Sequence, residues 1–339
     1  MIKVLYIDTE SFPAHLNFNS IHIKALIDAG AVVEGVFREG YSEKLNLPIK
    51  TAYCISHSLY GKRNNSMSAR LDMFKRLLAV KKNVEFNSYD KIILAYYDEL
   101  VLPFAGFPHG LYLINHINIG ALNHWLKIFL FKRLSRRNTQ IVLTKGARQF
   151  VLEIGVKQCI YIPHGLPIPY SKECCKPLWI KHRYFIFSPS ATSSDFRCIN
   201  SIVHNNQFIN YLQKNDILFI IRGAVSNVSS SNIKVIDNYM DTDEYQGCFI
   251  HSNAIFIAYK EDRYKYRASA IMLEAISNNK RIVARYSEGL SEYSYIIGDN
   301  SFFNSIDDLI NRLDRIIKKT KTIKYSNVEE PNYHNILFR

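Results

Sequence analysis

The segment that decides the fold is RASAIMLEAISNNKRIVARYSEGLSEYSYIIGDN, residues 267–300. An apolar run, AIFIAY (254–259), precedes it and predicts a buried strand. Residues 268–278 have the apolar spacing of a helix that begins at small side chains, and the apolar run 281–286 predicts the next strand. This strand–helix–strand order is typical of an α/β domain with a parallel sheet.

The same alternation continues outward from this segment. A proline-rich stretch, residues 163–169, interrupts it and predicts a domain boundary, because it holds three prolines and one glycine in seven positions. The expected strands cover 3–8, 31–37, 91–97, 110–116, 139–144 and 158–164 before the boundary, and 183–189, 216–223, 233–237, 254–259 and 281–286 after it. The expected helices cover 20–29, 66–82, 121–137, 145–154, 196–213, 241–252, 268–278 and 305–319.

Two α/β domains therefore follow each other along the chain. We expect an N-terminal Rossmann-like domain over residues 1–165 and a C-terminal one over 166–325, with 326–339 as a tail that packs back on the N-terminal domain. Open parallel sheets bind ligands at the carboxyl ends of their strands. Two such sheets that face each other would hold two substrates in an inter-domain cleft.

Composition limits the class of protein. Hydrophobic residues make up 47% of the 339 residues, with only 14 Gly and 10 Pro, which excludes a disordered or collagen-like chain. The formal net charge of +13 suits nucleic acid, an anionic membrane or a phosphorylated substrate, and charge alone does not choose among them.

The cysteines and the apolar runs indicate the compartment. Six scattered cysteines form no CxxC pair and fit a reducing cytoplasm. No stretch approaches the roughly 20 apolar residues that span a bilayer. We expect a cytoplasmic protein, with any membrane association peripheral, at the inner face of the cell membrane.

Residues 267–300 resemble the GT-B glycosyltransferases, specifically the large retaining group-one family (family 4-like) that uses nucleotide-sugars. The resemblance rests on a small-residue helix start, a Glu-Ala pair, a polar turn, an apolar strand and a glycine-containing loop with a glutamate. These elements are Ser269, Glu274–Ala275, 277–280, 281–284, 287–289 and Glu292. In its order of elements the resemblance extends from the first strand to about residue 300.

The resemblance implies an activity as well as the GT-B fold. The enzyme would be a retaining hexosyltransferase that moves a sugar from a nucleotide-sugar to a hydroxyl of a lipid-linked or polysaccharide acceptor. The implied pathway is polysaccharide biosynthesis for the bacterial cell envelope, such as O-antigen, capsule or lipopolysaccharide assembly.

The start of the helix at 268–278 is the expected diphosphate site. A helix N-terminus offers free backbone N–H groups and the positive end of the helix dipole. Ser269 and Ala270 are small enough for phosphate to approach the backbone, and Glu274 would accept hydrogen bonds from the ribose. Tyr266 and Arg267 complete this part of the donor site. The family usually has a glutamate where Tyr266 stands, so the contact to the donor sugar would differ.

A second donor-binding segment is FSPSATSSDFR, residues 187–197. By resemblance, Arg197 occupies a lysine position that faces the diphosphate, and Thr192 stands where the family has an arginine. Ser190 and Thr192 could donate hydroxyl hydrogen bonds instead. Arg222, which ends the next expected strand, is a further candidate cation.

The boundary segment and the N-terminal domain supply the remaining candidates. His164 and Gly165 lie where the family has a hinge, and His116, at the end of an expected strand, matches a histidine that touches the donor sugar. If the enzyme instead inverts the anomeric centre, it needs a base, and Asp8, Glu10 or His15 could serve. Each candidate also has a structural alternative, such as a solvated helix glutamate or a buried histidine.

No metal ligand set and no cofactor motif is evident, so we expect a metal-independent enzyme with the nucleotide-sugar as substrate. Asp241-Thr242-Asp243 has the spacing of a metal motif but is better interpreted as a helix cap. In GT-B enzymes the helix dipole and basic side chains usually neutralise the departing diphosphate.

Two basic segments account for much of the charge: WLKIFLFKRLSRR (125–137) and the tract 312–324. The first has the pattern of an interfacial helix, which favours an anionic membrane surface as partner. No nucleic-acid recognition motif is present, which makes nucleic acid an unlikely partner. The alternatives left open are an inverting or DNA-directed GT-B transferase, or a non-catalytic protein that binds a sugar nucleotide.

Overall fold

A computed structural model describes the chain apart from residues 62–64, 172, 192–195, 224, 226, 227, 229, 237–239, 260–263, 320–322 and 339. The side chains of residues 14, 190, 191 and 196 also lie outside this description. Thr192, one of the expected donor-site residues, is therefore not described, and neither is the side chain of Ser190.

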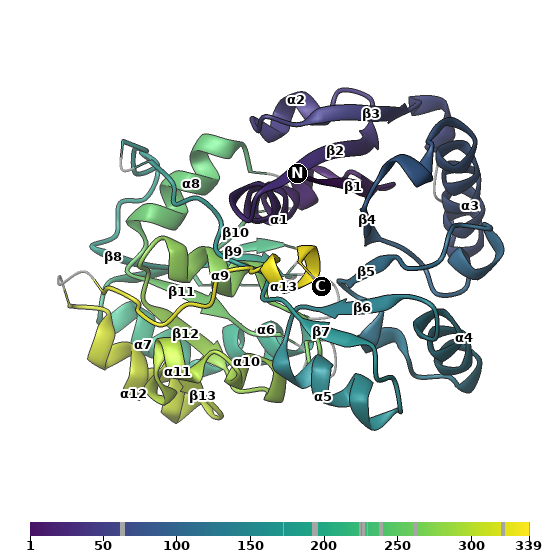
Figure 1. Ribbon diagram of the computed structural model, residues 1–339. Helices are drawn as coiled ribbons and strands as arrows, with labels where there is room; N and C mark the ends of the chain where they lie inside the picture. Colours follow the sequence, from purple (N-terminus) through teal and green to yellow (C-terminus); the bar gives the residue numbers. More distant parts are fainter. Residues whose placement is uncertain are drawn as a thin grey trace. The chain divides into compact units, whose positions relative to one another are not determined.

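The chain divides into two units, each built around its own sheet (Figure 1). Unit 1 comprises residues 1–165, 266–268 and 329–339, and unit 2 comprises 166–265 and 269–328. The last part of the chain thus belongs to the same unit as the first, and so does a three-residue segment just before the helix that contains Glu274.

Unit 1 is a seven-stranded sheet in the order β3-β2-β1-β4-β5-β6-β7, in which all neighbours are parallel. Its strands are β1 (Ile2–Asp8), β2 (Ala31–Arg38), β3 (Lys50–Ile55), β4 (Lys91–Tyr96), β5 (Tyr112–Asn115), β6 (Thr139–Val142) and β7 (Cys159–Tyr161). Its helices are α1 (Leu16–Asp28), α2 (Ser42–Leu45), α3 (Ser66–Asn83), α4 (Trp125–Ser135), α5 (Lys145–Glu153) and α13 (His334–Leu337).

Both faces of this sheet are buried, which is why its strands are nearly continuous apolar runs. On one face Tyr6 and Ile93 pack with α1, α2 and α13. On the other face Leu5 and Leu94 pack with α3 and with the short helix η4 (Leu102–Phe104). Leu134 of α4 joins that second core, so α3, η4 and α4 cover the same face (Figure 1).

Unit 2 is a six-stranded parallel sheet in the order β10-β9-β8-β11-β12-β13. Its strands are β8 (Tyr184–Ala191), β9 (Ile217–Gly223), β10 (Ile233–Ile236), β11 (Ala254–Ile257), β12 (Ile282–Arg285) and β13 (Phe302–Phe303). Its helices are α6 (Phe196–Val203), α7 (Asn206–Lys214), α8 (Thr242–His251), α9 (Ala270–Ser277), α10 (Glu288–Ser291), α11 (Ser294–Ile297) and α12 (Ile306–Ile316).

The predicted fold class, two parallel-sheet α/β domains, is confirmed by these two sheets. The observed elements differ from the predicted ones in several places, of which two have a clear physical reason. The expected helix 196–213 is two helices, because Asn205 caps α7 by accepting a hydrogen bond from the backbone N–H of Phe208 at 3.0 Å. Strand β3 was missed, because most of its residues are exposed or half-buried at the sheet edge and it has no clear apolar pattern.

Candidate functional site

The start of α9 in unit 2 is fixed by Ser269. Its hydroxyl accepts a hydrogen bond from the backbone N–H of Met272 at 3.1 Å and lies 3.1 Å from the hydroxyl of Tyr259. Its own backbone N–H donates to the hydroxyl of Tyr293 at 3.2 Å. Ser269 is fully buried. These contacts hold the first turn of α9 in one position.

The next two backbone amides also belong to the first turn of α9. Within the described part of the chain, the N–H groups of Ala270 and Ile271 have no acceptor, as is usual for the first turn of a helix. Ala270 is exposed and Ile271 is half-buried. The dipoles of the two N–H groups and the small side chain of Ala270 suit phosphate oxygens.

Glu274 lies one turn further along α9 and is held by two tyrosines. Tyr170 donates a short hydrogen bond to Oε1, and Tyr245 donates to Oε2 at 3.2 Å. Burial raises the pKa of Glu274 to about 7, against the opposing effects of the two tyrosine hydroxyls and of Arg222. The Arg222 guanidinium lies 5.2 Å from the centre of the Tyr245 ring.

The segment after the domain boundary is fastened to α9. The backbone N–H of Tyr170 donates to Oδ1 of Asn278 at 2.8 Å, and the hydroxyl of Ser277 donates to the carbonyl of Pro167 at 2.6 Å. Tyr170 and Tyr245 were not among the predicted site residues. They lie 104 and 29 residues from Glu274 in sequence, and no spacing pattern links them to it.

The glycine of α10, the short helix that follows β12, is required by packing. A Cβ atom on Gly289 would lie 1.8 Å from the backbone oxygen of Tyr264, so any side chain there would displace the backbone. Tyr264 stacks on Tyr259 with their ring centres 3.7 Å apart. Gly289 thereby supports the tyrosine that contacts Ser269.

The remaining predicted residues of unit 2 are less constrained. Arg197 lies at the start of α6 and is exposed. Arg222 lies near the carboxyl end of β9 and is half-buried. Of the cations expected near the diphosphate, Arg222 is the one whose charge acts on Glu274.

In unit 1, Asp8 organises the loop at the carboxyl end of β1. Its Oδ1 accepts hydrogen bonds from the backbone N–H groups of Glu10 at 2.9 Å and Ser11 at 3.0 Å. Its Oδ2 accepts from Asn19 at 2.8 Å and lies 3.1 Å from Nδ1 of His15. Burial alone would raise its pKa, but these contacts outweigh burial and lower the pKa to about 2. Asp8 is thus a buried anion that orients His15.

Glu10 is engaged in a buried ion pair. Nη2 of Arg76 lies 2.5 Å from Oε1 of Glu10, and both side chains are almost fully buried. The Arg76 guanidinium also lies over the Tyr60 ring, and Tyr60 donates a hydrogen bond to the carbonyl of Thr9 at 2.8 Å. Like Asp8, Glu10 is held in place by groups of its own unit.

Four histidines gather around Phe18 and its neighbours. His15 and His116 stack with ring centres 5.0 Å apart, and the Phe18 ring lies 3.9 Å from His116 and 4.1 Å from His22. Burial lowers the pKa of His116 and of His22 well below the usual range and that of His164 to about 4, so these three rings are neutral near pH 7. His116, the predicted sugar contact, thus stands beside the His15–Asp8 pair.

The backbone conformation at position 165 requires a glycine. Its φ of +77° lies in the left-handed region, and a Cβ there would lie 2.6 Å from Ile21 and 2.8 Å from Pro331. His164 lies beside it, with Nδ1 3.2 Å from the carbonyl of Gly165. The requirement for glycine here comes from α1 and from the returning C-terminal segment.

Tyr266 and Arg267 belong to unit 1. Tyr266 stacks on Phe150 of α5 with ring centres 4.7 Å apart, and Arg267 lies against Gly120, where a Cβ would be 3.3 Å from its Nε. Tyr266 therefore stands on an aromatic support where the resembled family has a carboxylate.

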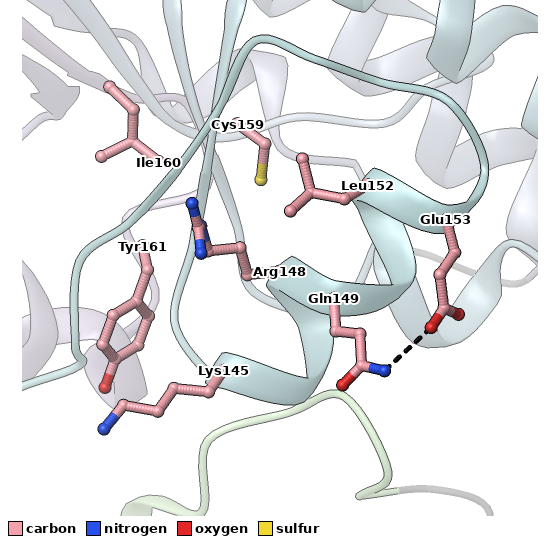
Figure 2. A pocket seen from close by; sticks show the side chains of 8 residues that line it. All are labelled: Lys145, Arg148, Gln149, Leu152, Glu153, Cys159, Ile160 and Tyr161. Atoms are coloured by element: carbon pink, nitrogen blue, oxygen red, sulfur yellow. Dashed lines mark hydrogen bonds between the residues drawn. The ribbon is translucent and has the colours of Figure 1, made fainter.

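A separate pocket of about 760 Å³ lies between α5 and the edge strand β7 (Figure 2). Lys145 and Arg148 line it together with Tyr161, and Gln149 donates a hydrogen bond to Glu153 at 2.9 Å. None of the predicted site residues lines this pocket.

The described residues contain no group of three or more His, Cys, Asp or Glu side chains arranged to hold a metal ion. They also contain no helix that combines the length and the apolar character needed to cross a membrane. Asp241 caps α8 by accepting from the backbone N–H of Glu244 at 2.7 Å, which confirms its interpretation as a helix cap.

Comparisons with known proteins place the fold. No protein-family model and no curated protein sequence matches the chain. Among solved structures, HepE from Anabaena in complex with UDP and glucose aligns with a TM-score of 0.63 and 14% identity over 94% of this chain and 91% of that one. The lipopolysaccharide outer core galactosyltransferase WaaB, in its apo form, aligns with a TM-score of 0.55 and 13% identity over 94% and 90%.

A third structure, UDP-N-acetylglucosamine 2-epimerase from Rickettsia bellii, aligns with a TM-score of 0.56 and 12% identity over 100% of this chain and 93% of that one. Together with the two parallel sheets, these similarities show that the chain has the GT-B fold, as the sequence predicted. Because this fold serves a transferase and an epimerase alike, the reaction has to be argued from the side chains.

Proposed function

We infer that the protein is a glycosyltransferase that moves a sugar from a nucleotide-sugar to a hydroxyl group. The observation that carries this inference is the arrangement on α9, where the backbone amides of Ala270 and Ile271 precede Glu274 by one turn. The amides suit a diphosphate, and a carboxyl group at that distance suits the hydroxyls of a ribose. The HepE structure with UDP and glucose supports the same class of ligand.

On this proposal the nucleotide binds to unit 2. Arg222 and Arg197 add positive charge near the diphosphate, and Ser190 and Thr192 add hydroxyl donors. As the bond to the anomeric carbon breaks, negative charge develops on the leaving diphosphate, and the α9 amides stabilise it. Donor binding then needs no metal, and a chelator should leave the activity unchanged.

The acceptor hydroxyl attacks the anomeric carbon of an oxocarbenium-like sugar. We assign the sugar contacts to His116 and to the segment of Tyr266 and Arg267, with His164 and Gly165 shaping the hinge. Transfer with retention follows from the resemblance to the group-one family. The neutral state of His116 allows it to donate or accept a hydrogen bond without adding charge.

One observation favours a second candidate, an inverting transferase. Asp8 holds Nδ1 of His15 at 3.1 Å, which leaves the other ring nitrogen of His15 able to take a proton from an acceptor hydroxyl. In that reaction His15 would be the base, with Asp8 positioning it. Glu10 has a smaller part in this alternative, since it is paired with Arg76. The configuration of the product distinguishes the two candidates.

The acceptor is proposed to be a lipid-linked or polysaccharide chain in assembly of the cell envelope. The basic segment 125–137 supports this, since it suits an anionic membrane at whose inner face such acceptors are held. WaaB, described as a lipopolysaccharide outer core galactosyltransferase, shares the fold. Glucosylation of DNA and a purely binding role are the remaining alternatives.

The test is a thermal-shift screen of the full chain against UDP-, GDP-, ADP- and CMP-sugars. We expect one nucleotide class to raise the melting temperature of the wild type and to raise that of Glu274→Ala by much less. An exposed control in the same unit, Glu173→Ala, should respond like the wild type. No shift with any donor, or an equal shift in Glu274→Ala, would contradict the proposal.

A further inference from the structure

The helices on one face of the unit 1 sheet expose apolar side chains to solvent. On α4, Trp125 and Phe129 are 71% and 53% exposed, and Phe104 of η4 is 68% exposed. Leu126 and, on α3, Met67 and Leu71 are exposed as well. Because α3, η4 and α4 pack on the same face of the sheet, these exposed side chains belong to one layer of unit 1.

Exposed residues follow a helical stripe on α4. Trp125, Phe129 and Arg133 are four residues apart, so they share the side opposite the buried Phe131 and Leu134. The exposed side is apolar over the first two turns and cationic toward the C-terminal end. A helix that serves only to cover a core has a polar outer face, so the exposed tryptophan and phenylalanine need another reason.

A cationic pocket adjoins the apolar part of this side. It has a volume of about 490 Å³ and lies between the C-terminal half of α4 and the loop 102–111. Its walls combine Phe107 and Phe129 with four cations, and no carboxylate lines it. The cations are Lys132, Arg133, Arg136 and Arg137.

Ion pairs with carboxylates do not explain why these four cations lie close together. Within the described residues, none of the four has a carboxylate within 4.0 Å, whereas Lys127, one turn earlier, is paired with Glu99 at 3.6 Å. Arg137 lies 2.8 Å from Nε2 of His109, which fixes it at the pocket wall. The C-terminal dipole of α4 accounts for Lys132 and Arg133, but Arg136 and Arg137 lie beyond the last helical residue.

We propose that this surface docks on an anionic phospholipid bilayer, with a headgroup phosphate in the cationic pocket and with Trp125, Phe129 and Phe104 inserted among the headgroups. The proposal rests on the membrane part of the proposed function and makes it specific to unit 1. It does not depend on sugar transfer. Arginine side chains bind phosphate by paired hydrogen bonds, and tryptophan favours the interfacial region of a membrane.

The apolar side chains decide between a bilayer and a nucleic acid. A nucleic-acid surface would use cations with aromatic stacking, but the two exposed leucines, Leu71 and Leu126, and Met67 gain nothing from bases or from a phosphate backbone. In a bilayer they leave water while the adjoining cations meet anionic headgroups. One layer that offers both kinds of contact therefore fits a membrane.

The second basic segment differs in its surroundings. Arg312 is paired with Asp308 at 2.9 Å, and α12 carries further acidic side chains at Asp307 and Asp314. No exposed large apolar residue lies on α12. We therefore expect the tract 312–324 to contribute little to docking, and its cations Arg315 and Lys318 provide a matched control because both are exposed.

The first experiment measures binding of the full chain to vesicles of phosphatidylcholine with about one third phosphatidylglycerol, by co-sedimentation without nucleotide-sugar. The double variant Arg136→Gln/Arg137→Gln should bind at least about 10-fold more weakly, since each cation near an anionic surface contributes roughly 5-fold. Arg315→Gln/Lys318→Gln should stay within about 2-fold of the wild type. Equal losses of vesicle binding in both variants, or no binding of the wild type to the vesicles, would overturn the proposal.

The second experiment follows insertion. Trp179→Phe leaves Trp125 as the only tryptophan, because the chain has two. Brominated lipids should quench its fluorescence, and Trp125→Ala should weaken binding several-fold while its melting temperature stays at the wild-type value. Absence of quenching would contradict insertion into a bilayer. If duplex DNA abolished vesicle binding, and Arg136→Gln/Arg137→Gln lost DNA binding and vesicle binding equally, the partner would be a nucleic acid and not a bilayer. A failed donor screen would leave this result unchanged, so the two proposals fail separately.

Discussion

The two units treat their buried ionisable groups in opposite ways. Unit 1 surrounds Asp8 with donors that lower its pKa to about 2, and it keeps three histidines neutral by burial. Unit 2 buries Glu274 with two tyrosine hydroxyls as its hydrogen-bond donors, and its pKa rises to about 7. The Asp8 carboxylate is surrounded by hydrogen-bond donors, whereas the Glu274 carboxyl group has fewer donors than it could accept.

This difference bears on the roles that we propose for the two carboxyl groups. A buried carboxylate that already accepts several hydrogen bonds gains little from a ligand. A carboxyl group with a raised pKa gains from any hydroxyl that reaches it, and raised values gather at functional sites. Asp8 thus supports the architecture of its loop, and the raised pKa of Glu274 supports the donor-binding role that we propose for it.

In unit 1, the largest effect is expected from removing the cation that pairs with the buried Glu10. Arg76→Met should destabilise the protein by about 3–5 kcal/mol, because it leaves the Glu10 carboxylate buried without its partner. Adding Glu10→Gln to this variant should recover part of the loss. The exposed pair of Lys24 and Asp28 serves as control, and Lys24→Met should cost less than about 1 kcal/mol in urea unfolding. Similar costs at both positions would show that Glu10 is not held as an anion.

The unit 2 side is tested by Glu274→Gln. The folded pKa of about 7 lies above the ordinary 4.5, so the folded state keeps a proton that the unfolded state releases between these values. Stability therefore falls as pH rises through this window, by ~3 kcal/mol in all. Glu274→Gln should be more stable than the wild type by that amount at pH 8 and equal to it at pH 4.5.

The control for this prediction is Glu173→Gln, an exposed position in unit 2, which should match the wild type at both pH values. Urea unfolding followed by amide hydrogen exchange reports unit 2 apart from unit 1. A Glu274→Gln variant that is no more stable at pH 8 would remove the contrast between the units.

Acid should weaken unit 1 through its neutral histidines. The pKa of His22 lies well below 6.5 in the folded state, so the unfolded state takes up a proton that the folded state refuses. The contribution of His22 to the free energy of unfolding therefore falls by about 1.4 kcal/mol for each pH unit below 6.5. His22→Gln should flatten the decline in unit 1 stability between pH 6.5 and 5 by about 2 kcal/mol. The exposed His334→Gln should keep the wild-type slope, and an unchanged slope in His22→Gln would show that this ring is protonated in the folded protein.

The smallest expected effect compares the helix starts of the two units. Thr144→Ala removes the cap of α5 and Ser269→Ala that of α9, each at a cost of about 1 kcal/mol. Ser269→Ala should cost more, because its hydroxyl also contacts Tyr259 at 3.1 Å in a fully buried position. Equal midpoints in urea would mean that the Tyr259 contact adds nothing.

Much of the fold could be predicted because buried parallel strands are apolar runs that sequence displays directly. Strand β1, for example, is buried over its last five residues and was predicted within one residue. Strand β3 was missed because an edge strand does not need that pattern. The break between α6 and α7 depends on a single capping asparagine, which is a weak signal within an amphipathic stretch.

The candidate site was predictable where its residues are neighbours in sequence. Ser269, Ala270 and Glu274 share one helix, so local spacing is enough to place them together. Other residues of the two candidate sites have partners that are distant in sequence. Tyr170 is 104 residues from Glu274, and Arg76 is 66 residues from Glu10. Such pairs are set by the packing of distant elements, which no pattern in one sequence displays.

The returning C-terminal segment has a consequence for how the protein is made. Tyr333 is fully buried in unit 1 and lies 2.7 Å from His22, a residue 311 positions earlier in the chain. A ribosome adds about 5–20 residues per second, so the first segment of unit 1, complete at residue 165, waits roughly 8–34 seconds for that side chain. During this interval the apolar side of α1 that packs with Tyr333, Ile336 and Leu337 is uncovered. Unit 1 is therefore begun first and completed last, and its uncovered side is open to aggregation until the C-terminal segment is made.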